Sequence, residues 1–130
     1  MKTVVASGYF NPLHKGHVRY LQAAKELGDR LIVVVNNDMQ VRVKGSQVFM
    51  DEEERCEIVQ ALKCVDDVRL SIDTDNTVCK SLESIKPYIF AKGGDSTEDN
   101  VPEKEVCEQN NIILALWSFW GFSICGSNRK

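Results

Sequence analysis

Short apolar runs alternate with amphipathic stretches along the chain. Five runs have the length of strands, and most of them are apolar at every position. They cover residues 4–6, 31–35, 68–72, 88–91 and 112–116. A strand that is hydrophobic on both faces belongs in a sheet that is covered on both sides, which is typical of parallel βαβ packing. The pattern therefore predicts an α/β fold, a Rossmann-like doubly wound parallel sheet of about five strands.

Amphipathic stretches between these runs predict four helices. They cover about residues 17–27, 51–62, 77–84 and 103–110. Gly28 follows the first of them, at a position that suits a left-handed C-cap. The second begins with the acidic run 51–54, which fits the first turn of a helix better than a metal site.

Two segments without a periodic pattern are candidates for functional loops. Residues 36–50 form an unusually long connection between a strand and a helix. Residues 93–101 are rich in Gly, Asp, Ser and Asn, and they also follow a strand. In open α/β sheets, ligands bind at the carboxyl ends of the strands, where both segments are predicted to lie.

Composition narrows the class of protein. The chain has 130 residues, of which 43% are hydrophobic, and this fits one soluble domain over residues 1–130. A formal net charge of -3 argues against a dedicated nucleic-acid binder. The apolar runs are far shorter than the roughly 20 residues that span a bilayer, so no membrane association is expected. The first residues are typical of a strand, and the five cysteines lack Cys-x-x-Cys spacing, which predicts a cytoplasmic location.

Two histidines give the sharpest chemical signal. They are the only histidines of the chain and lie in segment 8–17, Gly-Tyr-Phe-Asn-Pro-Leu-His-Lys-Gly-His, directly after the first predicted strand. If a helix begins near Gly16, its first N–H groups and the imidazoles of His14 and His17 converge on one spot. This predicts an anion pocket. The alternative is that the histidines only cap or flank the helix, and two such ligands are too few for a zinc site.

The segment resembles the G-x-F-[DN]-x-x-H-x-G-H signature of the cytidylyltransferase-like nucleotidyltransferases. The resemblance covers roughly residues 2–96, and it is strongest to glycerol-3-phosphate cytidylyltransferases and heptose-1-phosphate adenylyltransferase domains. It implies the nucleotidyltransferase architecture of this family. It also implies an enzyme in which a phosphorylated polyol, amino alcohol or sugar attacks the α-phosphorus of CTP or ATP and releases pyrophosphate. CTP is slightly favoured.

The resemblance also implies roles for individual residues. His14 and His17 would hold the triphosphate and stabilise charge in the transition state, and Lys44 would approach the acceptor phosphate. A solvated surface lysine is the alternative for Lys44, since Arg42 lies on the same segment. Nucleotide contacts are expected from Gly8, Tyr9, Phe10, Asn11, His14, Gly16, His17, Gly93, Asp95 and Ser123.

Further expectations concern the surroundings of the site. Arg55 is expected to orient Asp38 or the long loop, and a plain surface ion pair is the alternative. Mg²⁺ is expected to arrive with the triphosphate, without any metal ligand from the protein. The family habit implies a homodimer.

The chain departs from the family pattern in two places. Asn11 stands where cytidylyltransferases usually carry Asp. Near the C-terminus, Ser123 matches a family serine, but the matching arginine is missing and the last helix is expected to be absent. A nucleotide-binding or sensor protein with impaired catalysis is therefore the alternative function. The aromatic cluster within 117–122 is predicted to be core, a dimer contact or a stacking surface for a base.

Overall fold

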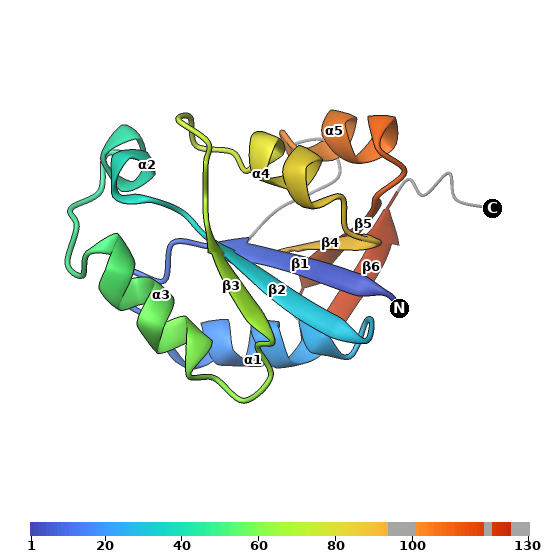
Figure 1. Cartoon of the computed structure of the whole chain (residues 1–130), viewed down its shortest axis with the longest axis horizontal. Coiled ribbons are helices and arrows are strands. Elements are labelled where there is room, and N and C mark those ends of the chain that lie inside the picture. Colours follow the sequence, from blue (N-terminus) through green and yellow to red (C-terminus); the bar gives the residue numbers. More distant parts are fainter. Residues whose placement is uncertain (94–100, 119–120, 126–130) are drawn as a thin grey trace.

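A sheet with helices on both faces organises the computed structural model, which describes residues 1–93, 101–118 and 121–125. The strands are β1 (Thr3–Gly8), β2 (Arg30–Val35), β3 (Asp67–Leu70), β4 (Ile89–Lys92), β5 (Ile113–Ser118) and β6 (Gly121–Cys125). The helices are α1 (Lys15–Lys25), α2 (Asp38–Val43), α3 (Glu52–Gln60), α4 (Cys79–Ile85) and α5 (Lys104–Gln109). Figure 1 shows α1 and α3 on one side of the sheet and α4 and α5 on the other.

The strand order is β3-β2-β1-β4-β5-β6. Strands β1 to β5 are parallel, as the apolar runs predict, and β6 is antiparallel to β5. The chain builds outward from β1 to β3, then returns to place β4 against the other side of β1. This reversal between β1 and β4 is the point at which such sheets open a ligand crevice.

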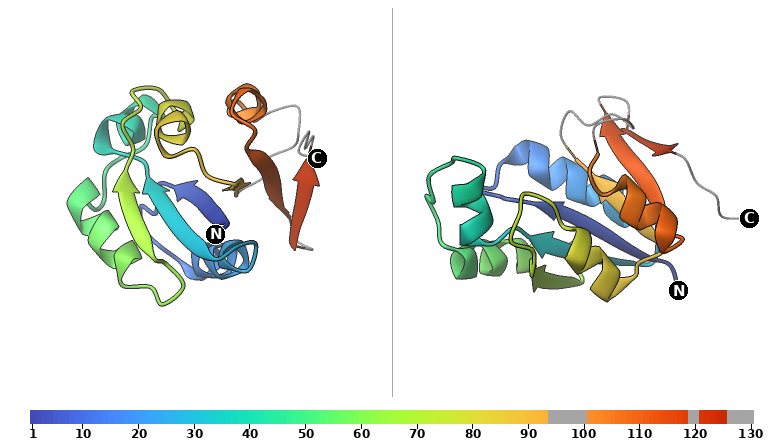
Figure 2. Two further views of the ribbon diagram at one scale, coloured as in Figure 1. Left: turned by 45° about the vertical axis from the view of Figure 1, so that its right-hand side comes forward. Right: turned by 90° about the horizontal axis from the view of Figure 1, so that it is seen from above.

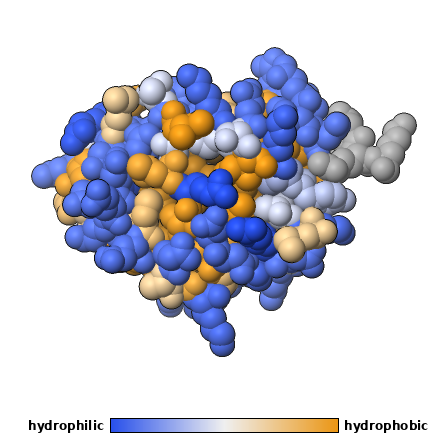
Figure 3. Space-filling model, in the orientation of Figure 1, coloured by the Kyte–Doolittle hydropathy of each residue, from blue (hydrophilic) through white to orange (hydrophobic). Residues whose placement is uncertain are grey.

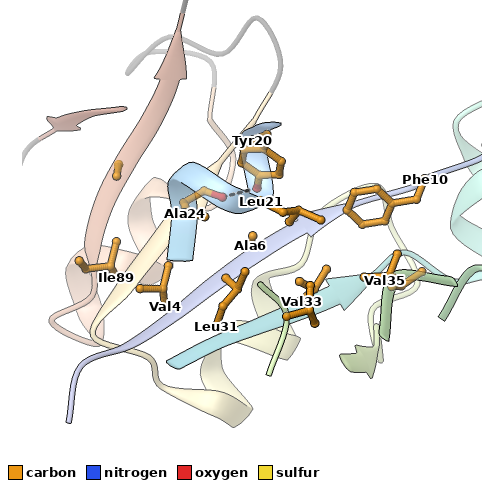
Figure 4. Close-up of a cluster of buried hydrophobic side chains, with 14 residues drawn as sticks. Val4, Ala6, Phe10, Tyr20, Leu21, Ala24, Leu31, Val33, Val35 and Ile89 are labelled. Atoms are coloured by element: carbon orange, nitrogen blue, oxygen red, sulfur yellow. Dashed lines mark hydrogen bonds between the residues drawn. The ribbon is translucent and has the colours of Figure 1, made fainter. Parts of the chain in front are cut away.

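Alternation along β1 divides the interior into two cores. Val4 and Ala6 are fully buried in the core that includes Leu21 and Ala24 of α1, as Figure 4 shows. Val5 points to the opposite face and packs in the second core, beneath α4 and α5. Because successive side chains of a strand alternate between faces, a strand that is apolar throughout requires both layers of helices. The doubly wound prediction is confirmed.

Helix α2 lies inside the segment that was expected to be an unpatterned loop. It has no apolar stripe, because Met39 and Val43 are exposed. The side chain of Asn37 caps the helix by accepting from the N–H of Gln40, and the Gln40 side chain accepts from the N–H of Asn37. Caps rather than hydrophobic periodicity define this helix, which is why the periodic pattern missed it. Figure 1 shows α2 beyond the end of the sheet.

Strand β6 adds a sixth strand where only the absence of a last helix was expected. Figure 2 shows β6 beside β5 at the edge of the sheet. The register pairs Leu116 with Ser123 and Trp117 with Phe122. Phe122 packs with Trp117 and Tyr20, with ring centroids 5.0 and 5.9 Å away. The short alternating run offers too few residues to distinguish a strand from an irregular tail.

Gly28 corrects another expectation, because it is not a left-handed C-cap. In the described ranges, the glycines with positive φ are Gly45 and Gly121. A Cβ on Gly28 would lie 2.6 Å from the carbonyl oxygen of Lys2 and 2.8 Å from Cγ2 of Val4. Gly28 is therefore required for the close approach of the turn after α1 to the beginning of β1.

The surface in Figure 3 carries an apolar area in the middle of the face shown in Figure 1, with polar side chains around it. Leu70 and Ile72, at the end of β3 and just after it, are among the exposed large apolar side chains of the described residues. Within the part of the chain that the structure describes, each helix is too short or too polar to cross a bilayer.

Candidate active site

A cavity of about 1110 Å³ opens at the carboxyl ends of β1, β2 and β4. Most of the residues expected to bind nucleotide line it, as do several that the sequence did not single out. The first group is Gly8, Tyr9, Phe10, Asn11, His14, Gly16, His17 and Gly93; the second includes Tyr20, Asn76, Lys92 and Glu103. Lys44, expected at the acceptor phosphate, and Trp117 of the aromatic cluster also line the cavity. The cavity therefore lies where the strand order reverses, as the topology predicts.

The loop between β1 and α1 is shaped around a buried aromatic ring. Phe10 has a φ of 50° and is 1% exposed. A Cβ on Gly8 would lie 2.7 Å from Cζ of Phe10, so only glycine leaves room for this ring. The same ring meets the His17 imidazole edge to face at 5.1 Å. Phe10 thus packs against the ring of His17 and also lines the cavity.

His14 and His17 form a capping box at the N-terminus of α1. Nδ1 of His14 accepts a hydrogen bond from the N–H of Gly16 (3.0 Å), and Nδ1 of His17 accepts from the N–H of His14 (3.1 Å). The rings stack with 3.7 Å between their centroids. Both histidines also line the cavity, so capping and a place in the site are combined and are not alternatives.

These hydrogen bonds determine which N–H donors remain available to a ligand. Nδ1 of each ring is an acceptor, so the proton of a neutral imidazole lies on Nε2. The N–H of Gly16 is taken by His14, and the N–H of His17 bonds to the carbonyl of His14 (3.0 Å). The expected convergence of backbone N–H groups on an anion is therefore not found at these two residues, because the cap satisfies them. The imidazole Nε2–H groups are the donors that remain.

The pKa of His17 is lowered to about 4. Partial burial is the main cause, since it disfavours the charged ring, and the neighbouring His14 adds to the effect. His17 is therefore a neutral N–H donor at physiological pH, and not a fixed positive charge.

Lys44 is the residue at which α2 ends, and its ammonium lies over the ring of Tyr9. The distance from Nζ to the ring centroid is 4.3 Å, which is typical of a cation–π contact. Burial, followed by the negative charges of Glu103 and Asp75, raises the pKa of Tyr9, so its hydroxyl stays protonated. Lys44 is exposed and lines the cavity, whereas Arg42 is not among the lining residues that the structure describes.

Arg55 lies behind the cavity wall and is completely buried. Its guanidinium donates to the carbonyls of Tyr9 (2.8 Å), Asn36 (2.6 Å) and Met50 (3.0 Å), and to Oδ1 of Asp38 (2.6 Å). The hydrogen bonds of this one guanidinium thereby connect the segments that follow β1 and β2 with the first turn of α2 and the segment that precedes α3. The contact with Asp38 is the one that the sequence led us to expect, and it is not a surface ion pair.

Asn11 uses its side chain to hold the loop after α2. Nδ2 donates to the carbonyl of Gln47 (2.7 Å), and Oδ1 accepts from the N–H groups of Phe49 (3.0 Å) and Met50 (3.1 Å). An aspartate lacks the donor for the first bond. The departure from the cytidylyltransferase pattern thus has a structural role in this chain, in fixing the position of the segment that follows Lys44.

The sequence did not single out a buried ion pair on the β4 side of the cavity. Nζ of Lys92 lies 3.3 Å from a carboxylate oxygen of Glu103, which is fully buried yet lines the cavity. An acidic residue just after Pro102 is typical of a helix start, so its position gave no sign of this role. The sequence signal that could have indicated this pair is Lys92, a charged residue at the end of a buried strand.

Three expected site residues need separate mention. Asp95 lies outside the described residues. Ser123 is on β6 and is exposed, and it is not among the described residues that line the cavity. Its neighbour Phe122 packs in the core that includes α1, and alternation along the strand turns Ser123 to the other face, so its expected contact with nucleotide stays a prediction. Of the aromatic cluster, Trp117 lines the cavity and packs with Phe122, while residues 119–120 lie outside the described ranges.

A sequence profile described as cytidylyltransferase-like matches residues 5–122. This chain belongs to the cytidylyltransferase-like family. The match spans β1 to β6 and so includes both histidines, Lys44, and the Lys92–Glu103 pair.

Named relatives extend the comparison. The chain is 43% identical over 120 residues to the bifunctional protein HldE of Geobacter metallireducens, covering 91% of this chain and 24% of that protein. It is 44% identical over 112 residues to an FAD synthase of Ferroglobus placidus, covering 86% of this chain and 72% of the relative. The chain thus spans about a quarter of the HldE proteins that it matches.

The fold has a close counterpart among solved structures. The crystal structure of a lipopolysaccharide core biosynthesis protein from Thermoplasma volcanium superposes with a TM-score of 0.74 at 33% sequence identity. The superposition covers 88% of this chain and 95% of the other. The Rossmann-like architecture expected from the sequence is confirmed.

Proposed function

We propose that this protein is a nucleotidyltransferase that transfers AMP or CMP from a nucleoside triphosphate to a phosphorylated small molecule and releases pyrophosphate. The observation that carries the proposal is the pair of imidazoles, each with Nδ1 in a hydrogen bond and Nε2 as its remaining donor, at the wall of a cavity of about 1110 Å³. The family match and the FAD synthase relative support it.

The proposed reaction places the polyphosphate at the histidines. Their Nε2–H groups donate to phosphoryl oxygens of the triphosphate, where negative charge grows as the α-phosphorus is attacked. An oxygen of the acceptor phosphate forms the new bond to phosphorus, and the bond to pyrophosphate breaks. The acceptor needs no strong general base, because a phosphate monoester has a second pKa of ~6 and is mostly dianionic at neutral pH.

Lys44 would serve the acceptor side. It follows the segment after β2, so it approaches the cavity from the side of β1 opposite to β4. Its flexible cation attracts the acceptor phosphate and offsets the repulsion between two polyanions. Asn11 and Arg55 do not act on the substrate themselves; they fix the segments from which Lys44 and Tyr9 project.

ATP is the preferred donor in this proposal, although the sequence slightly favoured CTP. FAD contains AMP, so an FAD synthase relative at 44% identity supports ATP. Asn11, in place of the usual aspartate of cytidylyltransferases, agrees with this choice. Mg²⁺ would enter with the triphosphate and neutralise its oxygens. The described residues include no group of three or more His, Cys, Asp or Glu arranged to hold a metal, so we assign no metal ligand.

The test is pyrophosphate release from ATP or CTP with Mg²⁺, measured with a panel of acceptors that includes glycerol 3-phosphate, a sugar 1-phosphate and FMN. We expect His14→Ala and His17→Ala each to lower turnover by about 100-fold or more, in line with other preorganised donors. Lys15→Ala is the matched control, because this exposed residue lies between the histidines and is not among the described residues lining the cavity.

Two other outcomes would change the conclusion. Nucleotide binding without pyrophosphate release for any acceptor would favour the alternative, a binding or sensor protein with impaired catalysis. Unchanged turnover in both histidine variants would contradict the proposed site while leaving the fold as it is.

A further inference from the structure

Glu103 presents an unusual arrangement of a buried charge. The residue is 0% exposed, and it forms part of the cavity wall. Its Oε2 accepts hydrogen bonds from the N–H of Val78 (3.1 Å) and from Nζ of Lys92 (3.3 Å). Its Oε1 lies 3.3 Å from the same ammonium but accepts no hydrogen bond from any group that the structure describes.

An open acceptor on a buried carboxylate is costly. A buried polar atom without a hydrogen bond loses the stabilisation that water gave it in the unfolded chain. An apolar pair of similar volume often serves stability as well as a buried ion pair does. Stability alone therefore gives no reason for a buried carboxylate with an open acceptor in a residue that lines the cavity.

The Lys92–Glu103 pair and the histidines lie at different strands of the sheet. β1 lies between β2 and β4 in the sheet, so the histidines that follow β1 lie between the Lys44 side and the Lys92 side. On the Lys92 side the cavity is also lined by Trp117 and by Gly93. A Cβ on Gly93 would lie 3.2 Å from the ring of Tyr20, so the glycine lets this ring pack closely against the end of β4.

We infer that Oε1 of Glu103 accepts a hydrogen bond from the nucleoside part of the bound nucleotide. This inference rests on the proposed function. A carboxylate only accepts hydrogen bonds and repels phosphate, so its partner is an uncharged O–H or N–H donor. A ribose hydroxyl and the exocyclic amine of the base share this chemistry. Lys92 is a positioning residue, since it neutralises the carboxylate and fixes its orientation.

The test compares analogues that lack one donor at a time. Dissociation constants are measured by calorimetry, with Mg²⁺, for ATP, 2′-deoxy-ATP, 3′-deoxy-ATP and inosine triphosphate. CTP and uridine triphosphate form the parallel pair. We expect one analogue to bind the wild type about tenfold more weakly than its parent, because a hydrogen bond to a charged acceptor is lost. The deoxy analogues report on the ribose, and the inosine and uridine nucleotides report on the amine.

Glu103→Gln is the diagnostic variant. Its neutral amide weakens the bond, so we expect the ratio of affinities between parent and analogue to shrink at least about threefold. Glu108→Gln, exposed and on α5, the helix that begins just after Glu103, should keep the wild-type ratio. If Glu103→Gln does not fold, the double variant Lys92→Met/Glu103→Gln removes both charges together, and the same shrinkage is expected. A residue that only stabilised the fold would change all affinities alike and leave the ratio unchanged.

The outcomes distinguish this inference from the function on which it rests. If the wild type binds ATP or CTP but shows no preference for either donor group, or if the ratio persists in the Glu103 variants, the inference is overturned and the proposed function stands. If the wild type binds neither nucleotide, both are overturned.

Discussion

Nδ1 of His17 accepts a hydrogen bond of 3.1 Å from the N–H of His14, the residue on whose ring it stacks. The bond fixes the His17 ring before any ligand arrives and leaves its proton on Nε2. Preorganised donors of this kind do not need to reorient as charge develops, which is what makes them effective in catalysis.

The pH response of His17 follows from its environment. Its pKa of about 4 in the folded protein is below the ordinary value of 6.5, so protonation favours the unfolded chain. The contribution of the neutral His17 ring to the free energy of unfolding is complete above about pH 6.5 and is lost as the pH falls towards 4. We expect an NMR titration of the ring protons to show a midpoint well below 6.5. In His17→Gln, the decline of unfolding free energy across this pH window should be smaller; an unchanged decline would assign it to other groups.

Lys44 and Arg42 provide a matched pair of cations at the end of α2. We expect Lys44→Ala to lower kcat/KM about 100-fold, because the cation that approaches the acceptor phosphate is lost. Arg42→Ala should stay within about twofold of the wild type, since only long-range attraction changes. Steady-state kinetics with the acceptor varied would show the difference. Equal losses of kcat/KM in the two variants would mean that the total positive charge near the cavity, rather than the position of Lys44, determines the rate.

Two glycines should respond to the same substitution in opposite ways. In Gly16→Ala the new Cβ would lie 2.9 Å from Cε1 of His14, so the ring must move. We expect at least about a tenfold loss of activity with little change in stability, because alanine suits the first turn of a helix. In Gly28→Ala the Cβ would lie 2.6 Å from the carbonyl oxygen of Lys2, and a backbone atom has little freedom to yield.

Gly28→Ala should therefore cost about 1–3 kcal/mol of unfolding free energy while leaving turnover of the folded fraction unchanged. Urea unfolding and the pyrophosphate assay, run on both glycine variants, check this crossed pattern. A loss of stability in Gly16→Ala, or of turnover in folded Gly28→Ala, would refute the separation of roles.

Arg55 should dominate the stability of the site. Arg55→Met removes the donor to three backbone carbonyls and leaves the carboxylate of Asp38 without its partner. We expect a loss of about 3–5 kcal/mol in urea unfolding. Arg69→Met is the control, because Arg69 is 52% exposed in its pair with Asp67, and such pairs contribute less than about 1 kcal/mol. A small effect of Arg55→Met would show that the carbonyls find other donors.

Much of the fold could be predicted because its signals are strong and local. Strands such as β2, apolar at nearly every position, require two covering layers, and this alone indicates a doubly wound sheet. α2 was not predicted because its capping residues, Asn37 and Gln40, define it, and the helix has no hydrophobic periodicity. β6 was not predicted because its pairing with β5 forms only in the folded sheet, and the sequence of neither strand identifies the other as its partner.

The parts of the site that could be predicted are those whose residues lie close together in the sequence. His14 and His17 are three residues apart, so their convergence could be read from the sequence, whereas Lys92 and Glu103 meet only through the packing of α5 beside β4. The role of Arg55 was expected from the family resemblance, but its complete burial and its carbonyl partners came from the structure. Mg²⁺ binding, a homodimer and the cytoplasmic location stay predictions.

Tyr9 is held from two directions, its carbonyl by the guanidinium of Arg55 and its ring by the ammonium of Lys44. The first contact is made by a fully buried residue and the second by an exposed one, so under the proposed function a phosphate would compete only for Lys44. A substrate that draws Lys44 away would uncover the phenol ring without disturbing the peptide beneath it. The solvent exposure of this ring would then report acceptor binding separately from nucleotide binding and so establish the order of the two binding events.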